Sequence, residues 1–589
     1  MSGLRIADCG LRIDAALRVA SRALLAEMNA EGHWTGELSS SALSTATAVV
    51  ALATMDRKRH GDLIAGGLRW LAAHANADGG WGDTTRSKSN ISTTALCWAA
   101  FGAAGADGEY PNVVVAADRW LEQASASRNL VAAIKLRYGN DRTFSVPILM
   151  TLALAGRIGW ENVAPLPFEL AALPHQLFGA LRLPVVSYAL PALIAIGQVI
   201  HHHHPTRNPL ARLLRGAVRA RTLDVLATLQ PENGGFLEAT PLTSFVTMSL
   251  AAMDRRDHVV AKKGVEFLRA SARADGSWAI DTNLATWVTT LAIKALPAGS
   301  FSPEEKLTLR EWLLGQQYRR EHPYTHAAPG GWAWTDLPGG VPDADDTPGA
   351  LLALLALGAI DSEIEQAGRA GVRWLLDLQN RDGGIPTFCR GWGALPFDRS
   401  APDLTAHTLR AWSAWSPHLD ARTKKQTLRA ITRGLTFLAK TQRPDGAWLP
   451  LWFGNEHARG DENPVHGTAH VILALRELRE RGFDIREPML ADAVRWLAGW
   501  QGADGGWSGA KDGPPSVEET ALAIGALAGT AEVGAVDRGA RWLIERVESG
   551  DWREPAPVGF YFAKLWYSER LYPLIWTVGA LGIFKSITR

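Results

Sequence analysis

The sequence is poor in cysteine and carries almost no net charge. Its three cysteines, Cys9, Cys97 and Cys389, form no CxxC pair and no even set of disulfide partners, which favours a reducing compartment. The 61 Lys and Arg residues nearly balance the 60 Asp and Glu residues, and the net charge is +1. A chain without a basic excess gives no electrostatic reason to expect nucleic acid as a partner.

Long apolar stretches are also scarce, with one exception. From Leu183 to Ile200 the chain carries no charged residue, over a length at the lower limit for a membrane-spanning helix. Pro184 and Pro191 interrupt helix continuity there. The apolar, Pro-rich stretch 165–200 is therefore predicted to dip into one leaflet rather than to span the bilayer. A pair of buried core helices is the alternative.

Tryptophan and glycine, by contrast, are abundant at 24 and 57 residues, and the two recur together. A motif related to Gln-x-x-Asp-Gly-x-Trp returns at intervals of about 40–60 residues, a period typical of helical-hairpin repeats. Asp-Gly or Asn-Gly favours a turn, the Trp is expected to pack against its neighbours, and the Gln can link adjacent units by hydrogen bonds. The copies end at Trp34, Trp81, Phe236, Trp278, Ile385, Trp448 and Trp507, with a partial copy, PGGWAW, at 329–334.

The segments around these turns predict an all-α protein. Ala/Leu-rich helices such as 41–55 follow the turns, and no stretch alternates with the period of two that a strand needs. Stacked helical hairpins form either an open solenoid or closed double rings. Because the copies fall into two clusters, we predict two α/α barrels, at 21–299 and 300–589, divided in the Pro/Gly/Ser-rich loop 296–305. Residues 1–20 are expected to pack on the second barrel.

A cluster of three carboxylates supplies the strongest chemical signal. Asp343, Asp345 and Asp346 lie together in the sequence VPDADDTPGA. The apolar run that follows predicts a helix with Thr347 as its N-cap and Pro348 in its first turn. A helix N-terminus favours the anion, whereas burial and crowding keep one proton in place, and a Brønsted acid needs this compromise. An acidic surface loop and a Mg²⁺ site are the alternatives.

A second polar segment follows one repeat later. Asp403 and His407 in PDLTAHTL are four residues apart and share one face of a predicted helix. A carboxylate can hold a histidine protonated, and that histidine can hydrogen-bond a second carboxylic acid. A structural histidine on an apolar helix face is the alternative reading.

Taken together, these motifs resemble the squalene–hopene cyclases, the class II triterpene cyclases. The resemblance rests on DADDT shortly after Trp334, on Gln/Gly/Trp repeats to both sides and on DLTAH downstream, and it extends from about Gly32 to WYSERLYP. It implies two α/α barrels with a large apolar cavity between them, and monotopic association with one leaflet on the cytoplasmic side. It leaves room for a homodimer. It implies no metal and no organic cofactor, because an acid does the chemistry.

The resemblance also implies a role for each acidic residue. Asp345 would protonate a terminal alkene of squalene and start a carbocation cascade, while Asp343 and Asp346 would tune its acidity. His407, with Asp403 behind it, would hydrogen-bond the acid and make its free proton more acidic. The implied product is a polycyclic triterpene of the hopene or hopanol kind, formed after deprotonation or addition of water.

Aromatic side chains are expected to line the cavity. Squalene has no polar group, so shape and apolar burial must bind it, and aromatic faces stabilise a cation without attacking it. The resemblance assigns this role to Trp287, Trp334, Phe388, Trp452, Tyr188, Phe560, Tyr561 and Tyr567.

The sequence departs from the family pattern near the expected cavity. The acid motif continues DDTP in place of DDTA, His466 replaces a Tyr before Gly-Thr, and SALSTATAVV lacks an acidic residue usual in the first helix. A cyclase of another linear polyprene and a noncatalytic α/α-barrel isoprenoid-binding protein are the main alternatives. An oxidosqualene cyclase would carry Cys at Asp346, a diterpene cyclase would have fewer repeats, and a prenyltransferase β-subunit would need a zinc site with a Cys ligand.

Overall fold

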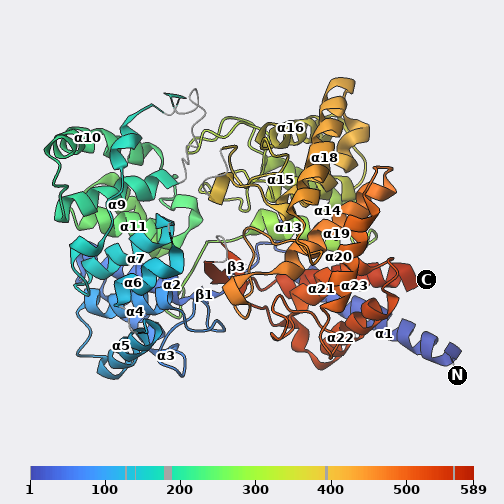
Figure 1. Ribbon diagram of the computed structural model, residues 1–589, viewed down its shortest axis with the longest axis horizontal. Coiled ribbons are helices and arrows are strands. Elements are labelled where there is room, and N and C mark those ends of the chain that lie inside the picture. The colour runs from blue at the N-terminus through green and yellow to red at the C-terminus, as the bar shows by residue number, and fades with distance from the viewer. Residues whose placement is uncertain are drawn as a thin grey trace.

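The protein is mostly helical, and its helices form two groups that lie side by side (Figure 1). The computed structural model describes residues 2–126, 129–139, 141–174, 176–177, 189–391, 396–560 and 564–588. Tyr188 and Tyr561, two of the predicted cavity aromatics, lie outside the described residues. The strands are short and antiparallel: β1 (Ser40–Ser41) pairs with β2 (Trp278–Ala279), and β3 (Val558–Phe560) with β4 (Leu565–Tyr567).

The first group is a double ring of helices. Its inner helices pack on one another in a closed circle and are α2 (Ala42–Asp56), α4 (Ile91–Ala104), α7 (Arg142–Leu154), α9 (Leu190–His203) and α11 (Thr240–Ala251). The outer layer contains α3 (Gly61–Ala73), α5 (Pro111–Ala124), α6 (Leu130–Tyr138), α10 (Pro209–Thr228) and α12 (Val259–Ala270). Short 3-10 turns lie at η1 (Trp160–Asn162), η2 (Phe168–Ala172) and η4 (Phe236–Glu238).

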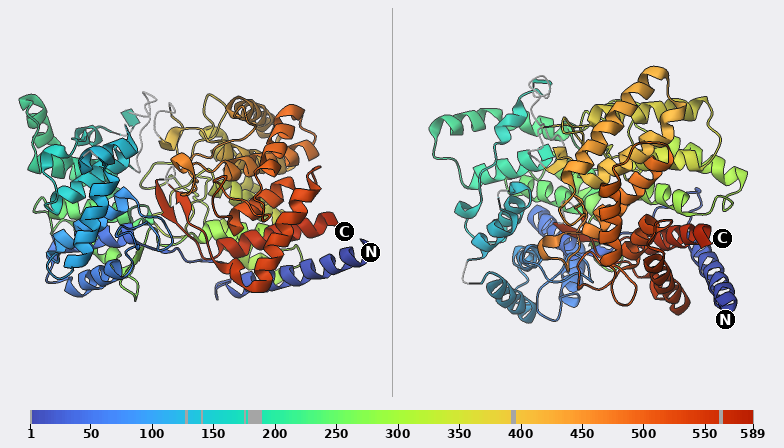
Figure 2. Two further views of the ribbon diagram at one scale, coloured as in Figure 1. Left: turned by 60° about the horizontal axis from the view of Figure 1, so that its bottom comes forward. Right: turned by 45° about the vertical axis from the view of Figure 1, so that its right-hand side comes forward.

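The second group repeats this plan. Its closed inner circle is α13 (Ala285–Ala295), α15 (Asp346–Ala356), α17 (Pro402–Trp415), α19 (Pro464–Glu480), α21 (Val517–Leu527) and α23 (Tyr572–Thr588). The outer helices are α14 (Pro303–Gly315), α16 (Ser362–Leu378), α18 (Ala421–Thr441), α20 (Glu487–Gly499) and α22 (Val533–Ser549). The N-terminal helix α1 (Ser2–Ala26) lies against α22 and α23, so both chain ends are on the second ring (Figure 2).

Helix α13 closes the second ring, because it packs on both α15 and α23. The ring packing therefore divides the chain before Ala285, whereas the sequence placed the division in the loop 296–305. That loop instead joins inner helix α13 to outer helix α14 within one ring. A turn-rich composition marks a connection between helices, and it does not by itself distinguish a link within a barrel from a link between barrels.

The repeat turns tie each hairpin to the next, as the sequence predicted. In the copy that ends at Trp448, the backbone N–H donates to Thr468 Oγ1 at 2.9 Å, and the indole N–H donates to the carbonyl of Leu438 at 2.8 Å. Gln442 of the same turn donates to the carbonyl of Met489 on the following outer helix, also at 2.9 Å. The fully buried indole and the linking amide confirm both expected roles.

The apolar stretch 165–200 divides between core and surface. Helix α9 is an inner helix of the first ring, with Ile194 and Ile196 fully buried, so the predicted leaflet contact is wrong for this half. The reason is that α9 fills the ring between α7 and α11. Leu170 and Leu173, from the other half, are exposed. Among the described residues, none of the helices combines the length and the apolar character needed to cross a bilayer.

Candidate active site

Asp345 lies directly before inner helix α15 and is its N-cap residue. The predicted N-cap, Thr347, lies in the first turn instead, where its hydroxyl oxygen accepts the N–H of Trp332 at 3.0 Å. The repeat turn thus uses the threonine, and the helix starts closer to the acid than the sequence indicated. The Asp345 side chain is 23% exposed, and it lines a cavity of about 580 Å³.

His407, on inner helix α17, contacts Asp345 as predicted. Its Nδ1 lies 2.7 Å from Oδ1 of Asp345. Burial lowers the pKa of His407 well below its usual value, and the positive charges of Lys294 and Arg410 act in the same direction. The ring is therefore neutral near pH 7, whereas the sequence predicted a protonated histidine.

Burial raises the pKa of Asp345 to about 7, and the positive charge of Lys294 opposes part of this rise. An aspartate with an ordinary pKa would be almost completely deprotonated at neutral pH. Lys294 is on α13, one turn after Thr290, which packs close to Gly349 of α15. The sequence analysis missed this lysine, although a single charge in the apolar helix TWVTTLAIKAL was a readable signal.

The flanking carboxylates have different tasks. Asp343 Oδ1 accepts the backbone N–H groups of Asp345 and Asp346, each at 2.8 Å, and so holds the loop before α15. Burial raises the pKa of Asp343 to about 7. The pKa of Asp346 is well above its usual value, because of burial and then the charge of Asp343. Of the three, Asp345 is the one that lines the cavity.

Asp403 lines the same cavity as Asp345. Burial, followed by the negative charge of Asp345, raises the pKa of Asp403 to about 7. Its Oδ1 is buried, and within the described part of the chain it has no hydrogen-bond partner. The predicted contact between Asp403 and His407 is also not formed among the described residues, although both residues are on α17. The two carboxyl groups, Asp345 and Asp403, face one space.

Trp287 and two tyrosines form a hydrogen-bonded group beside the acid. The indole ring of Trp287 is edge-on to His407, with ring centroids 6.3 Å apart. Its Nε1–H donates to the hydroxyl of Tyr572 at 3.0 Å, and the hydroxyls of Tyr567 and Tyr572 are 2.7 Å apart. These bonds fix the ring planes. Tyr572 also lines the cavity, and the sequence analysis did not single it out.

The other predicted aromatics that the structure describes form a continuous series. Ring centroids are 6.3 Å apart for Trp334 and Phe388, 5.8 Å for Phe388 and Trp452, and 5.6 Å for Trp452 and Phe560. The series continues from Phe560 to Tyr567 at 5.3 Å. Residues separated by more than 200 positions in sequence thus meet in one cluster of edge-to-face and tilted rings.

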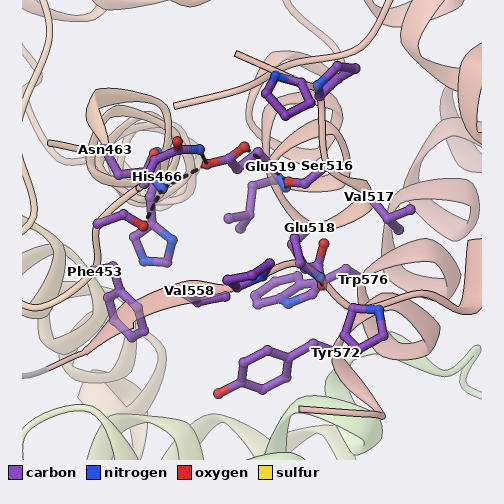
Figure 3. A pocket seen from close by; sticks show the side chains of 18 of the residues that line it. Phe453, Asn463, His466, Ser516, Val517, Glu518, Glu519, Val558, Tyr572 and Trp576 are labelled. Atoms are coloured by element: carbon purple, nitrogen blue, oxygen red, sulfur yellow. Dashed lines mark hydrogen bonds between the residues drawn. The ribbon is translucent and has the colours of Figure 1, made fainter. Parts of the chain in front are cut away.

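Two cavities lie close to this aromatic series, although its five rings are not part of the lining of either. Tyr567, at one end of the series, is hydrogen-bonded to Tyr572, which lines the larger cavity. The larger is the one lined by Asp345, Asp403 and Trp287; Figure 3 shows part of its wall. The smaller, of about 130 Å³, has an almost entirely apolar lining that includes Phe397. Phe397 also packs against Trp452, with ring centroids 6.0 Å apart. The aromatic series therefore connects the wall of the apolar cavity to the acid-bearing one.

The acidic cluster was also considered as a metal site. Across the residues that the structure describes, no group of three or more His, Cys, Asp or Glu side chains is arranged to hold a metal ion. Oδ1 of Asp343 instead organises the backbone of the acid loop.

Comparisons with known proteins agree with this architecture. The family model of the squalene-hopene cyclase N-terminal domain matches residues 17–233, and that of the C-terminal domain matches residues 282–586. A squalene–hopene cyclase of Alicyclobacillus acidocaldarius is 26% identical, with 96% of each chain covered. Enfumafungin synthase of Hormonema carpetanum is 25% identical over 91% of this chain, which spans 45% of the length of that protein.

The fold is similar to that of ent-copalyl diphosphate synthase from Streptomyces platensis, with a TM-score of 0.52, 19% identity, and coverage of 98% of this chain and 99% of the other. At this identity the similarity concerns the fold alone. The two domain models together cover most of the sequence, and each falls on one of the two helical rings. The chain therefore belongs to the squalene–hopene cyclase family of terpene cyclases.

Proposed function

We propose that this protein is a class II triterpene cyclase in which Asp345 protonates a terminal alkene of squalene. The carbocation cascade that follows would give a polycyclic triterpene of the hopene or hopanol kind, ended by deprotonation or by addition of water. The observation that carries the proposal is the 2.7 Å contact between His407 and Asp345, the acid that lines a partly apolar cavity. Membership of the family supports the reaction class.

The pKa of Asp345 suits a Brønsted acid. A pKa of about 7 keeps the proton on a substantial fraction of the acid at neutral pH, so that it is available to an alkene. A neutral His407 that donates its Nδ1–H to Oδ1 leaves Oδ2 to carry the reactive proton. After transfer, that hydrogen bond stabilises the carboxylate, and so does the charge of Lys294 to the extent that this lysine is protonated, since burial lowers its own pKa to about 7. The carboxylate that remains is therefore stabilised, which favours transfer of the proton to the alkene.

The aromatic series suits the cation that follows. Each well-placed ring can stabilise a nearby cation by about 0.5–2 kcal/mol, and a ring offers no lone pair that would trap it. The hydrogen bonds between Trp287, Tyr572 and Tyr567 hold ring faces in place before the substrate arrives. Rings that do not reorganise during the cascade cost less free energy in each step.

We also propose monotopic association with one leaflet of a membrane, with the cytoplasmic side taken from the family resemblance alone. A surface on the first ring supports the leaflet contact. On α10, Leu210 is 77% exposed and Leu213 is 74% exposed, and Leu170 of η2 adds a third exposed leucine. Arg212 and Arg219 lie on the same helix. Exposed leucines interleaved with arginines are typical of helices that lie in the interface of an anionic membrane.

The direct test is to incubate detergent-solubilised protein with squalene and to analyse the extract by gas chromatography–mass spectrometry. A polycyclic isomer or hydrate that is absent from an Asp345→Asn sample would support both the acid and the reaction class. If folded wild-type protein converts neither squalene nor any other linear polyprene, the proposal fails, and a noncatalytic isoprenoid-binding barrel becomes the better description.

A further inference from the structure

The acid-bearing cavity has a polar wall that a hydrocarbon substrate does not explain. Beyond Asp345, the cavity is bounded by the first turns of α19 and α21, which carry His466 and Glu518. Figure 3 shows Phe453 on the side of His466 and Tyr572 on the side of Glu518. Seven carboxyl side chains and two guanidinium groups are among the described residues that line it. The second cavity, by contrast, is lined almost wholly by carbon.

Two neighbouring glutamates of this wall differ in how their oxygens are used. Glu519 Oε1 accepts hydrogen bonds from Asn455 at 2.9 Å and Asn463 at 2.8 Å, and its Oε2 accepts the hydroxyl of Ser516 at 3.0 Å. All of its capacity serves the protein, and it holds the loop against α21. Glu519 is therefore a structural residue.

Glu518, in contrast, has an oxygen to spare. Its Oε1 accepts the N–H of Ala556 at 3.0 Å. Its Oε2 is buried and has no partner among the described residues, and the residue as a whole is only 5% exposed. The buried Oδ1 of Asp403, in the same wall, is also unpartnered. Buried polar groups in proteins nearly always have a partner, so these atoms indicate that a polar ligand group belongs in the cavity.

The charge of the wall decides which polar group fits. Of the two guanidinium groups, Arg86 is paired with Glu554 at 2.9 Å, and Arg546 stacks on Trp542 at 3.4 Å. Both are already engaged, and seven carboxyl groups surround them. Among the described lining residues, a diphosphate or a carboxylate would find both guanidinium groups engaged, whereas a neutral hydroxyl can donate directly to the free oxygen of Glu518.

We infer that the acid-bearing cavity accepts a linear isoprenoid alcohol, with its terminal alkene at Asp345 and its hydroxyl donating to Glu518. The inference rests on the proposed proton-initiated cyclization, and it narrows the substrate to a polyprene with a neutral, hydrogen-bonding end. Glu518 is then a specificity residue that touches substrate but takes no part in the proton transfer.

Binding can be measured apart from the chemistry. In the Asp345→Asn variant, tryptophan fluorescence would be followed during titration with geranylgeraniol, geranylgeranyl diphosphate and squalene in the same detergent. The alcohol is expected to bind at least tenfold more tightly than either of the others. Equal or tighter binding of squalene, or of the diphosphate, would overturn the inference and would leave the proposed acid untouched.

Turnover then tests the residue. In protein that keeps Asp345 and carries Glu518→Leu, kcat/KM for geranylgeraniol should fall about tenfold or more relative to wild type. For squalene, kcat/KM should stay the same or rise. Glu518→Gln, which keeps an acceptor for the Ala556 N–H, guards against misfolding and should show a smaller loss in the same direction. Glu266→Gln, on the exposed face of α12 and outside the cavity lining, is the control. Equal losses for both substrates in Glu518→Leu and Glu518→Gln would contradict the assignment. Absence of all products from wild type, with tight binding of the alcohol, would reject the cyclase proposal but retain the site.

Discussion

The two helical rings are built with the same turn but use it for different ends. In the first ring Trp81 donates its N–H to Thr94 Oγ1 at 2.9 Å, and in the second Trp507 donates to Thr520 Oγ1 at the same distance. In both cases the indole N–H also reaches a leucine carbonyl at the end of the preceding outer helix. The turn therefore places the start of each inner helix in the same way in both rings.

The difference lies in the side chains at those helix starts. One buried acid of the first ring, Asp83, is fully engaged: its oxygens accept hydrogen bonds from Asn90, Thr93 and the N–H of Trp566. In the second ring, Asp345 lines a cavity and Asp403 keeps an unpartnered oxygen. In this repeated scaffold the hydrogen bonds of the turn position each inner helix. Side chains at the helix start are therefore not needed for that purpose and can carry a reactive group.

The largest expected effect comes from exchanging these two acids for asparagine. Asp345→Asn should lower the rate of cyclization by about 10³-fold or more, with little change in stability, because the Asp345 side chain makes no capping hydrogen bond that would be lost. Asp83→Asn should instead lower the free energy of unfolding by about 1–3 kcal/mol, because an amide nitrogen would face a hydrogen-bond donor. Product yield per folded molecule and urea unfolding distinguish the two. A similar loss of stability in both variants would erase the contrast.

The next effect tests the shared scaffold. Trp81→Ala and Trp448→Ala each remove a fully buried indole and its hydrogen bond, and each should cost about 3–5 kcal/mol of stability. Hydrogen exchange followed by mass spectrometry would assign the loss to the ring that carries the change. The expectation of equal structural roles fails if one substitution is tolerated and the other unfolds its ring.

A smaller effect is expected from the buried lysine beside the acid. The positive charge of Lys294 lowers the pKa of Asp345, so Lys294→Met should raise that pKa above about 7 and make a weaker acid. The rate should fall up to about tenfold below pH 7, and the decline of activity that follows deprotonation should begin at higher pH. A pH–rate profile measures both. Lys440→Met, on the exposed side of α18, is the control, and an unshifted profile in Lys294→Met would contradict the coupling.

The smallest effects concern the helix caps. Asn90 caps α4 and Ser516 caps α21 through their side-chain oxygens. Each change to alanine should cost about 1 kcal/mol in thermal unfolding. Ser516→Ala should in addition raise KM, because Ser516 holds Glu519 in the cavity wall. Loss of substrate affinity in Asn90→Ala as well would show that the rings are less separate in function than their side chains indicate.

Much of the fold could be predicted because its rules are local. Gln442 and Trp448 act within and next to their own turn, so a repeated motif was enough to anticipate both hydrogen bonds. The contact between Asp345 and His407 was anticipated from family resemblance, since the two residues are 62 positions apart. The assignment of α13 to the first barrel was wrong, because a loop's composition carries no information about which helices close a ring.

Other features depend on packing across the ring. Tyr572 and Glu518 look ordinary in the sequence, and their significance comes from neighbours on other elements of the fold. The prediction of a protonated His407 was wrong. The sequence suggested a nearby carboxylate, but it could not reveal the burial that lowers the pKa of this histidine.

The sequence by itself determined the helical repeats, the acid motif and the set of aromatic residues, since these follow from residue type, spacing and motif. The tertiary structure decided which carboxyl oxygens are satisfied and which face a cavity, and where the polar wall lies. The physical reason is that burial and partner atoms control pKa and hydrogen bonding, and both are set by side chains brought together from distant repeats.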